Sequence, residues 1–290
     1  MTTTAPTQPT HPTHPTHPTQ PTQPTQPTQS TNSLRSGLIL TRRELQHWAR
    51  QPLTPIFGIM FTIMLLLMFA LLFGGSIDLP GGGDYIHFLL PGMMALSMMF
   101  GVEATTTAMA NDAKKGITDR FRSLPIGDTS VAFGRVGADM ITSTVELTVL
   151  IVGGLLLGWR ITGSPAEALL AVVLLLWFRM AVLWIGIYLG LTIGRNEGAG
   201  MLVQVLVWPV GFLSAAFVSP EFMPSWLEPV ATWNPISATA TAVRELFGNP
   251  TGYTGGLLAD HAVLAAVIWP LVLLAVFVPL SARAYRRLSR

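Results

Sequence analysis

Two adjacent stretches decide the fold: the apolar run Ile86–Ala110, IHFLLPGMMALSMMFGVEATTTAMA, and the polar segment Asn111–Ser130, NDAKKGITDRFRSLPIGDTS. Another apolar run, Met140–Gly158, begins soon after the polar segment. A helix of ~20 apolar residues is long enough to cross the hydrocarbon core of a bilayer. The polar segment is therefore predicted to join two membrane spans, although such a connection needs far fewer residues.

The polar segment has the pattern of a short amphipathic helix. Ile117, Phe121 and Leu124 follow an i, i+4, i+7 spacing, which places them on one helical face. Four cations and three acids accompany them: Lys114, Lys115, Arg120, Arg122, Asp112, Asp119 and Asp128. An amphipathic helix at the cytoplasmic surface of a membrane domain indicates a docking element for a soluble partner.

The composition is that of an integral membrane protein. Of 290 residues, 50% are hydrophobic and 11% are charged, and the mean hydropathy is +0.50, whereas soluble domains are about 25% charged. Because only helices satisfy the backbone in lipid at this apolarity, we expect an all-α membrane protein with six transmembrane helices. The six runs are Pro55–Phe73, Ile86–Ala110, Met140–Gly158, Ala166–Ile193, Ala199–Val218 and His261–Leu280.

The distribution of cations predicts the orientation of these spans. Fourteen Lys and Arg residues lie before the first span, after the second, after the fourth or after the sixth, while only Arg160 and Arg244 lie on the opposite side. Basic residues mark the cytoplasmic side of a membrane. Both termini are therefore predicted to be cytoplasmic, in a multi-pass protein of the plasma membrane.

Two segments precede the predicted transmembrane domain, residues 53–290. Residues 1–32 hold almost nothing apolar, and Gln8–Thr28 repeats Pro-Thr with Gln or His at a period of three, so we expect a disordered tail. Residues 33–52 are predicted to form an amphipathic helix in the membrane interface, with Arg42 and Arg43 on its polar face and Trp48 on its apolar face. Packing of this helix on a soluble partner is the alternative.

The segment Ser219–Asp260, between the last two spans, is predicted to lie on the outer side. Trp226 and Trp233 suit a membrane interface, and Thr239–Phe247 resembles a short helix that Gly248 ends. We therefore expect short outer-leaflet helices rather than a plain extracellular loop.

Three ionisable residues fall within the spans, where charge is costly and often functional. Glu103 and Glu146 lie in the cytoplasmic halves of the second and third spans, and Arg179 lies near the middle of the fourth. Arg179 and one of the glutamates can form an interior ion pair. Such a pair either orients the helices or takes part in transport.

Motifs for chemistry are missing from the sequence. It has no phosphate-binding GxxxxGK[ST] loop, no HExxH and no GxSxG, so we expect neither enzyme activity, a metal site, a bound cofactor nor nucleic-acid binding. If the protein pumps a substrate, its energy must come from another polypeptide or from an ion gradient.

The run KKGITDRFRSLPIGDTS at Lys114–Ser130 resembles the signature loop of ABC-2-type transporter permeases, and is most similar to the daunorubicin/doxorubicin-resistance permease subfamily. Two further stretches are similar to this family in the same order: DYIHFLLPGMM at Asp84–Met94 and FVSPEFMPSWLEPVATWNPISATATAVREL at Phe217–Leu246. The resemblance extends from about Leu34 to the C-terminus and leaves out the Pro-Thr tail.

The resemblance implies the permease subunit of an exporter that moves amphipathic small molecules, such as drugs. It implies a permease homodimer in which each copy docks a separate ATPase subunit that binds ATP and Mg²⁺. The polar segment would be the coupling helix, and the implied coupling residues are Lys115, Gly116, Asp119, Arg120, Phe121, Arg122 and Pro125. Two alternatives stay open: export of lipid-linked glycans or lipids by the same machinery, and a membrane scaffold that transports nothing.

Overall fold

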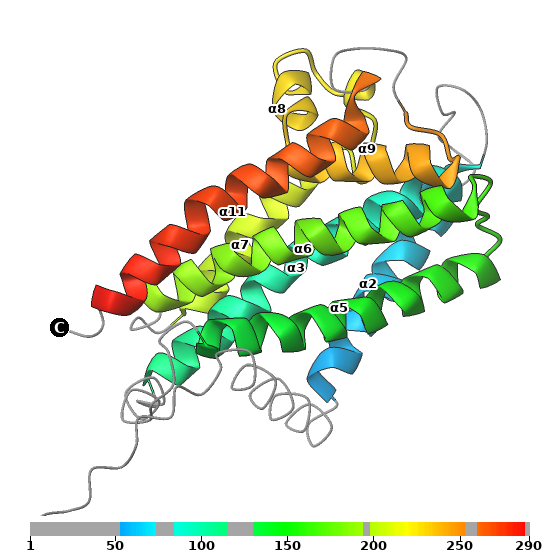
Figure 1. The fold of residues 1–290 in the computed structure, drawn as a ribbon. Coiled ribbons are helices and arrows are strands. Elements are labelled where there is room, and N and C mark those ends of the chain that lie inside the picture. Colours follow the sequence, from blue (N-terminus) through cyan, green and yellow to red (C-terminus); the bar gives the residue numbers. More distant parts are fainter. Residues whose placement is uncertain (1–52, 74–83, 115–129, 194–197, 253–259, 288–290) are drawn as a thin grey trace, which may run out of the picture. The chain divides into compact units, whose positions relative to one another are not determined.

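The computed structural model describes residues 53–73, 84–114, 130–193, 198–252 and 260–287, which all belong to one compact unit (Figure 1). Every regular element in these ranges is a helix, which confirms the all-α prediction for this part of the chain. The predicted tail (1–32), the predicted interface helix (33–52) and residues 115–129 of the polar segment lie outside the described residues.

Four helical stretches are long and apolar enough to cross a membrane: Tyr85–Asp112, Arg135–Leu156, Pro165–Ile193 and Ala262–Tyr285. They belong to α3 (Tyr85–Lys114), α5 (Ser130–Leu156), α6 (Pro165–Ile193) and α11 (Ala262–Arg287). Two apolar stretches are shorter, Gly58–Leu72 in α2 (Leu53–Phe73) and Gly200–Phe212 in α7 (Ala199–Phe212). All six predicted spans coincide with helices, while the count of six crossings stays a prediction.

Helix α3 is the centre of the bundle, since it contacts α2, α5, α6, α7 and α9 (Figure 1). Its residues Leu89, Leu90, Met93 and Met94 are each 0% exposed. Helix α6 packs closely along it at Gly186, where an added Cβ would lie 2.9 Å from the nearest α3 atoms. Small residues permit such close helix packing in membranes.

Helix α5 begins ten residues before the predicted third span, Met140–Gly158. The prediction stopped at the charged residues Arg135 and Asp139, which a span should avoid. In the structure these two residues are one helical turn apart and form an ion pair of 3.1 Å. Because the charges compensate each other, the helix continues through them.

Helix α7 ends at Phe212, whereas the predicted span continued to Val218. The side-chain amide of Asn234 donates to the carbonyl oxygens of Val210 and Leu213, both at 2.8 Å. The last carbonyls of a helix have no partner within the helix. A side chain 21 residues beyond Leu213 therefore completes the end of α7, which sequence periodicity does not reveal.

Short helices lie between α7 and α11, as predicted: η1 (Pro220–Phe222), α8 (Glu228–Thr232) and α9 (Pro235–Phe247). Asn234 also caps α9, because its side-chain oxygen accepts the N–H of Ile236 at 2.9 Å. Gly248 ends α9 in the left-handed region, at φ 68°. Helix α9 is largely buried and contacts α3, α6 and α11.

Candidate functional site

The predicted coupling residues, Lys115 to Pro125, lie outside the described residues, as do Arg42, Arg43 and Trp48 of the predicted interface helix. The structure describes the two helices on either side of the coupling segment. Helix α3 ends at Lys114 and α5 begins at Ser130, and these two helices contact each other. Segment 115–129 therefore joins neighbouring helices.

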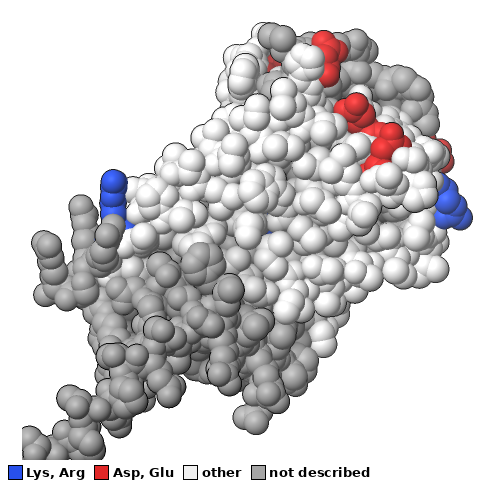
Figure 2. Space-filling model, viewed as in Figure 1, with Lys and Arg blue, Asp and Glu red and all other residues white. Residues whose placement is uncertain are grey.

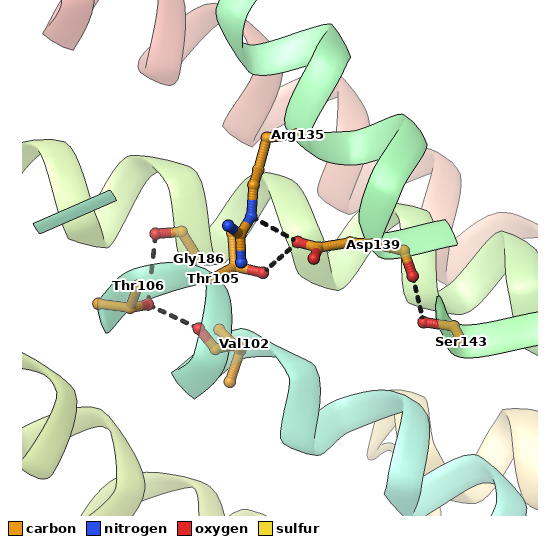
Figure 3. A network of polar contacts seen from close by, with 7 residues as sticks. All are labelled: Val102, Thr105, Thr106, Arg135, Asp139, Ser143 and Gly186. Carbon is orange, nitrogen blue, oxygen red and sulfur yellow. Dashed lines mark hydrogen bonds and ion pairs between the residues drawn. The ribbon is translucent and has the colours of Figure 1, made fainter. Parts of the chain in front are cut away.

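A buried polar network connects α3 and α5 close to that segment (Figure 3). Asp139 of α5 is 4% exposed. One of its carboxylate oxygens, Oδ2, accepts from Arg135 Nε at 3.1 Å and from the Thr105 hydroxyl of α3 at 2.9 Å. The Ser143 hydroxyl donates to the Asp139 backbone carbonyl at 2.8 Å. The carboxylate thus bridges a cation of its own helix and a hydroxyl of the next.

The next residue of α3 makes the corresponding contact with α6 (Figure 3). The Thr106 hydroxyl lies 2.7 Å from the Val102 carbonyl oxygen of its own helix and 3.3 Å from the Gly186 carbonyl oxygen of α6. Adjacent threonines of α3 therefore face α5 and α6, so the three helices meet at one level.

Arg179, in the middle of α6, is 4% exposed. Its Nη1 donates to the Met98 carbonyl of α3 at 3.0 Å. The guanidinium crosses α3 at Gly101, where a Cβ would lie 1.3 Å from Nη1. Only glycine leaves room for this side chain.

The two glutamates of the spans differ in their electrostatic influence on Arg179. Glu146 of α5 is half-buried and interacts electrostatically with Arg179, and its carboxyl is close to the Ser97 hydroxyl. Asp139 is the second acid that acts on Arg179. Glu103 is half-buried on α3 and is not among the charges that act on Arg179. Of the two glutamates, only Glu146 thus acts on Arg179, without a direct ion pair between them, and a role in transport stays a prediction.

Aromatic rings from α2, α3, α7 and the turn after α7 form a continuous series, which we call the aromatic column. Trp208 is its centre, with ring centroids 5.8 Å from Phe61, 5.0 Å from Phe100 and 5.7 Å from Phe212. The series continues from Phe212 to Phe217 at 5.3 Å and to Phe69 at 4.5 Å. Phe61 and Phe212 are 40% and 51% exposed, so the column has an accessible apolar side.

Arg244 of α9 is fully buried, although the sequence analysis counted it among the outer charges. Its Nε donates to the Phe88 carbonyl at 2.8 Å and its Nη2 to the Ala216 carbonyl at 3.1 Å. The guanidinium also lies 3.5 Å from the centroid of the Phe88 ring. Arg244 therefore attaches α9 to α3 and to the turn after α7.

Sequence reasoning missed Asp139, Arg244 and the aromatic column as parts of the site. The i, i+4 spacing of Arg135 and Asp139 was a usable signal for the first. The others depend on contacts between segments far apart in the chain. Among the described residues, no group of three or more His, Asp or Glu side chains is placed to hold a metal ion.

Apolar helices around a few buried, compensated charges define a polytopic α-helical membrane protein. Residues 36–247 match the sequence profile of the family described as "ABC-2 type transporter", and the chain belongs to that family. The resemblance found in the sequence is thereby confirmed.

The relatives extend this result. The chain is 32% identical, over 84% of its length and 83% of the relative's, to "Daunorubicin resistance ABC transporter permease protein DrrB1" of Streptomyces coeruleorubidus. It is 22% identical to "Probable doxorubicin resistance ABC transporter permease protein DrrC" of Mycobacterium tuberculosis, over 87% and 88% of the two chains. Identity to "Probable multidrug ABC transporter permease YbhR" of Escherichia coli is 23%, over 57% of this chain and 44% of the relative.

Proposed function

We propose that this chain is the membrane subunit of an ATP-driven exporter of amphipathic small molecules such as drugs. The observation that carries the proposal is the family match, which spans most of the chain and is joined by relatives named for daunorubicin and doxorubicin resistance. A separate ATPase subunit hydrolyses ATP with Mg²⁺, and this chain is not itself an enzyme.

We place six crossings in the plasma membrane with both termini in the cytoplasm. Figure 2 supports this arrangement, because the middle of the visible face is almost entirely uncharged and its acids gather toward one end. Exposed acids lie in the segments predicted to be outside or at the outer end of a span: Asp84, Glu167, Glu221, Glu228, Glu245 and Asp260. Trp226 and Trp233, 74% and 61% exposed, suit the outer interface.

The ATPase docks on the polar segment 111–130, with the helix at 33–52 beside it. In this proposal Phe121 fills an apolar pocket of the ATPase while Arg120 and Arg122 pair with its acids. Closure of the ATPase dimer moves both permease copies and switches access across the membrane.

The substrate surface is the accessible side of the aromatic column. Apolar residues of α2 and α7 flank it, including Met64 at 57% and Val205 at 64% exposed. A large exposed apolar surface in a membrane protein contacts lipid or another helix. We place a second copy of the chain opposite α2 and α7, so that hydrophobic molecules pass between the copies.

The test compares two Phe→Ala variants in cells that depend on the exporter for doxorubicin efflux. Phe121→Ala removes the proposed docking side chain, whereas Phe222→Ala removes an exposed phenyl, 56% exposed, on the opposite side. We expect Phe121→Ala and Arg120→Glu to abolish efflux at normal membrane levels, and Phe222→Ala to retain it. Normal efflux in Phe121→Ala and Arg120→Glu refutes the docking assignment.

A further inference from the structure

The polar contact between α3 and α5 lies equally far along both helices from the segment that joins them. Thr105 is nine residues before the end of α3 at Lys114, and Asp139 is nine residues after the start of α5 at Ser130. At 1.5 Å per residue, both are about 14 Å from the ends that segment 115–129 joins. The contact therefore joins the two helices of a hairpin near the end at which segment 115–129 connects them.

Helix α5 contacts α6 and α2 as well as α3, but little of its surface is buried. Only 28% of the residues in its apolar stretch Arg135–Leu156 are buried, against 78% for the stretch Tyr85–Asp112 of α3. Many of its large apolar side chains are exposed, for example Val145 at 54% and Val152 at 51%. A helix with so little buried surface depends strongly on its few directional contacts.

Asp139 and Thr105 supply such a contact. The carboxylate oxygen Oδ2 accepts the Thr105 hydroxyl at 2.9 Å, and Arg135 compensates its charge from the same helix at 3.1 Å. Gly186 of α6 also lies near Thr105, because a Cβ added at Gly186 would be 2.9 Å from the Cβ of Thr105. The pair thus links α5 to α3, the helix at the centre of the bundle.

We infer that Thr105, Arg135 and Asp139 form a clasp that makes α3 and α5 move as one lever when the ATPase acts on segment 115–129. The inference rests on the proposed function, since it assumes that the ATPase docks there. Without the clasp, α5 moves separately from α3 when the ATPase acts. ATP is then hydrolysed without a matching movement of substrate.

The test measures molecules of doxorubicin transported per ATP hydrolysed, in proteoliposomes that hold the permease and its copurified ATPase. Thr105→Val removes the hydroxyl that reaches α5 and keeps the shape of the side chain. Its matched control is Thr144→Val, because the exposed Thr144 hydroxyl binds only the Met140 carbonyl of its own helix, at 2.9 Å. Asp139→Asn removes the charge and keeps the size.

We expect Thr105→Val and Asp139→Asn to lower the transport-to-hydrolysis ratio by about fivefold or more, the lower end of typical coupling between sites. Thr144→Val should match the wild type. A residue that only stabilises the fold would lower the amount of active protein and leave this ratio unchanged. An unchanged ratio in Thr105→Val therefore overturns the inference.

A reversible tether provides a second measurement. The chain contains no cysteine, so Thr105→Cys with Asp139→Cys gives two unique thiols for a short bifunctional methanethiosulfonate linker. We expect the untethered double variant to be uncoupled and the tethered form to regain the ratio, with loss again after reduction. A ratio that stays low after complete tethering contradicts the clasp. A wild-type complex that transports no probe with ATP refutes the proposed function itself, and the inference with it.

Discussion

Replacement of Arg179 by methionine tests the buried charges of the bundle. Arg179 is 4% exposed, donates to the Met98 carbonyl and is influenced by the charge of Glu146, without a direct ion pair between them. Breaking a buried ion pair by removing one partner costs about 3–5 kcal/mol, because the other charge remains without compensation. Because Glu146 acts on Arg179 without a direct ion pair, we expect Arg179→Met to cost about 3 kcal/mol, the lower end of that range.

The assay is the midpoint of thermal unfolding in detergent, followed by intrinsic fluorescence. At about 2–4 °C per kcal/mol for a chain of this size, Arg179→Met should lower the midpoint by about 6–12 °C. The control Arg283→Met changes an exposed arginine of α11 and should shift the midpoint by no more than about 2 °C.

The double variant Arg179→Met with Glu146→Gln separates charge compensation from lost packing. Removing both charges leaves no buried carboxylate to compensate, so most of the lost midpoint should return. If the double variant is as unstable as Arg179→Met, the pairing with Glu146 is wrong. If Arg179→Met itself unfolds at the wild-type temperature, the charge of Arg179 does not contribute to the stability of the fold.

Three further predictions concern packing, substrate and the tail. Gly186→Ala should cost about 1–3 kcal/mol of unfolding free energy by overpacking α6 on α3, whereas Gly153→Ala, with nothing within 4 Å of the added Cβ, should be neutral; thermal unfolding checks both. Trp208→Ala interrupts the aromatic column. It should raise the doxorubicin concentration for half-maximal transport-linked ATP hydrolysis by about tenfold, since each aromatic contact contributes about 0.5–1.5 kcal/mol. An unchanged concentration would exclude the column from the substrate path. Deletion of residues 2–29 should leave efflux unchanged, and loss of efflux would reveal a role for the tail.

The sequence predicted every described span helix because each is a long apolar run. Two of its misplaced boundaries have a cause in side-chain contacts. Helix α5 continues through Arg135 and Asp139 because these charges are paired, and α7 stops at Phe212 because Asn234 binds its last carbonyls. Hydropathy averaged along the sequence depends on which residues are charged or apolar, but not on the residues that they contact.

The sequence likewise predicted some residues of the candidate site and missed others. Arg179 and Glu146 were found because ionisable residues are conspicuous in a span, and the structure shows that they interact. Arg244 was placed among surface charges, since its segment is polar, and its burial depends on Phe88 and the turn near Ala216. The aromatic column joins residues more than a hundred positions apart, which no local pattern encodes.

In the proposed function, this chain moves small molecules with energy from a separate ATPase. The most direct measurement is doxorubicin accumulation in inverted proteoliposomes that contain the purified chain, with and without the copurified ATPase and ATP. We predict accumulation only when the chain, the ATPase and hydrolysable ATP are all present. Vesicles that hydrolyse ATP at the same rate with or without doxorubicin, and accumulate none across a panel of amphipathic probes, would contradict the claim and indicate a membrane scaffold.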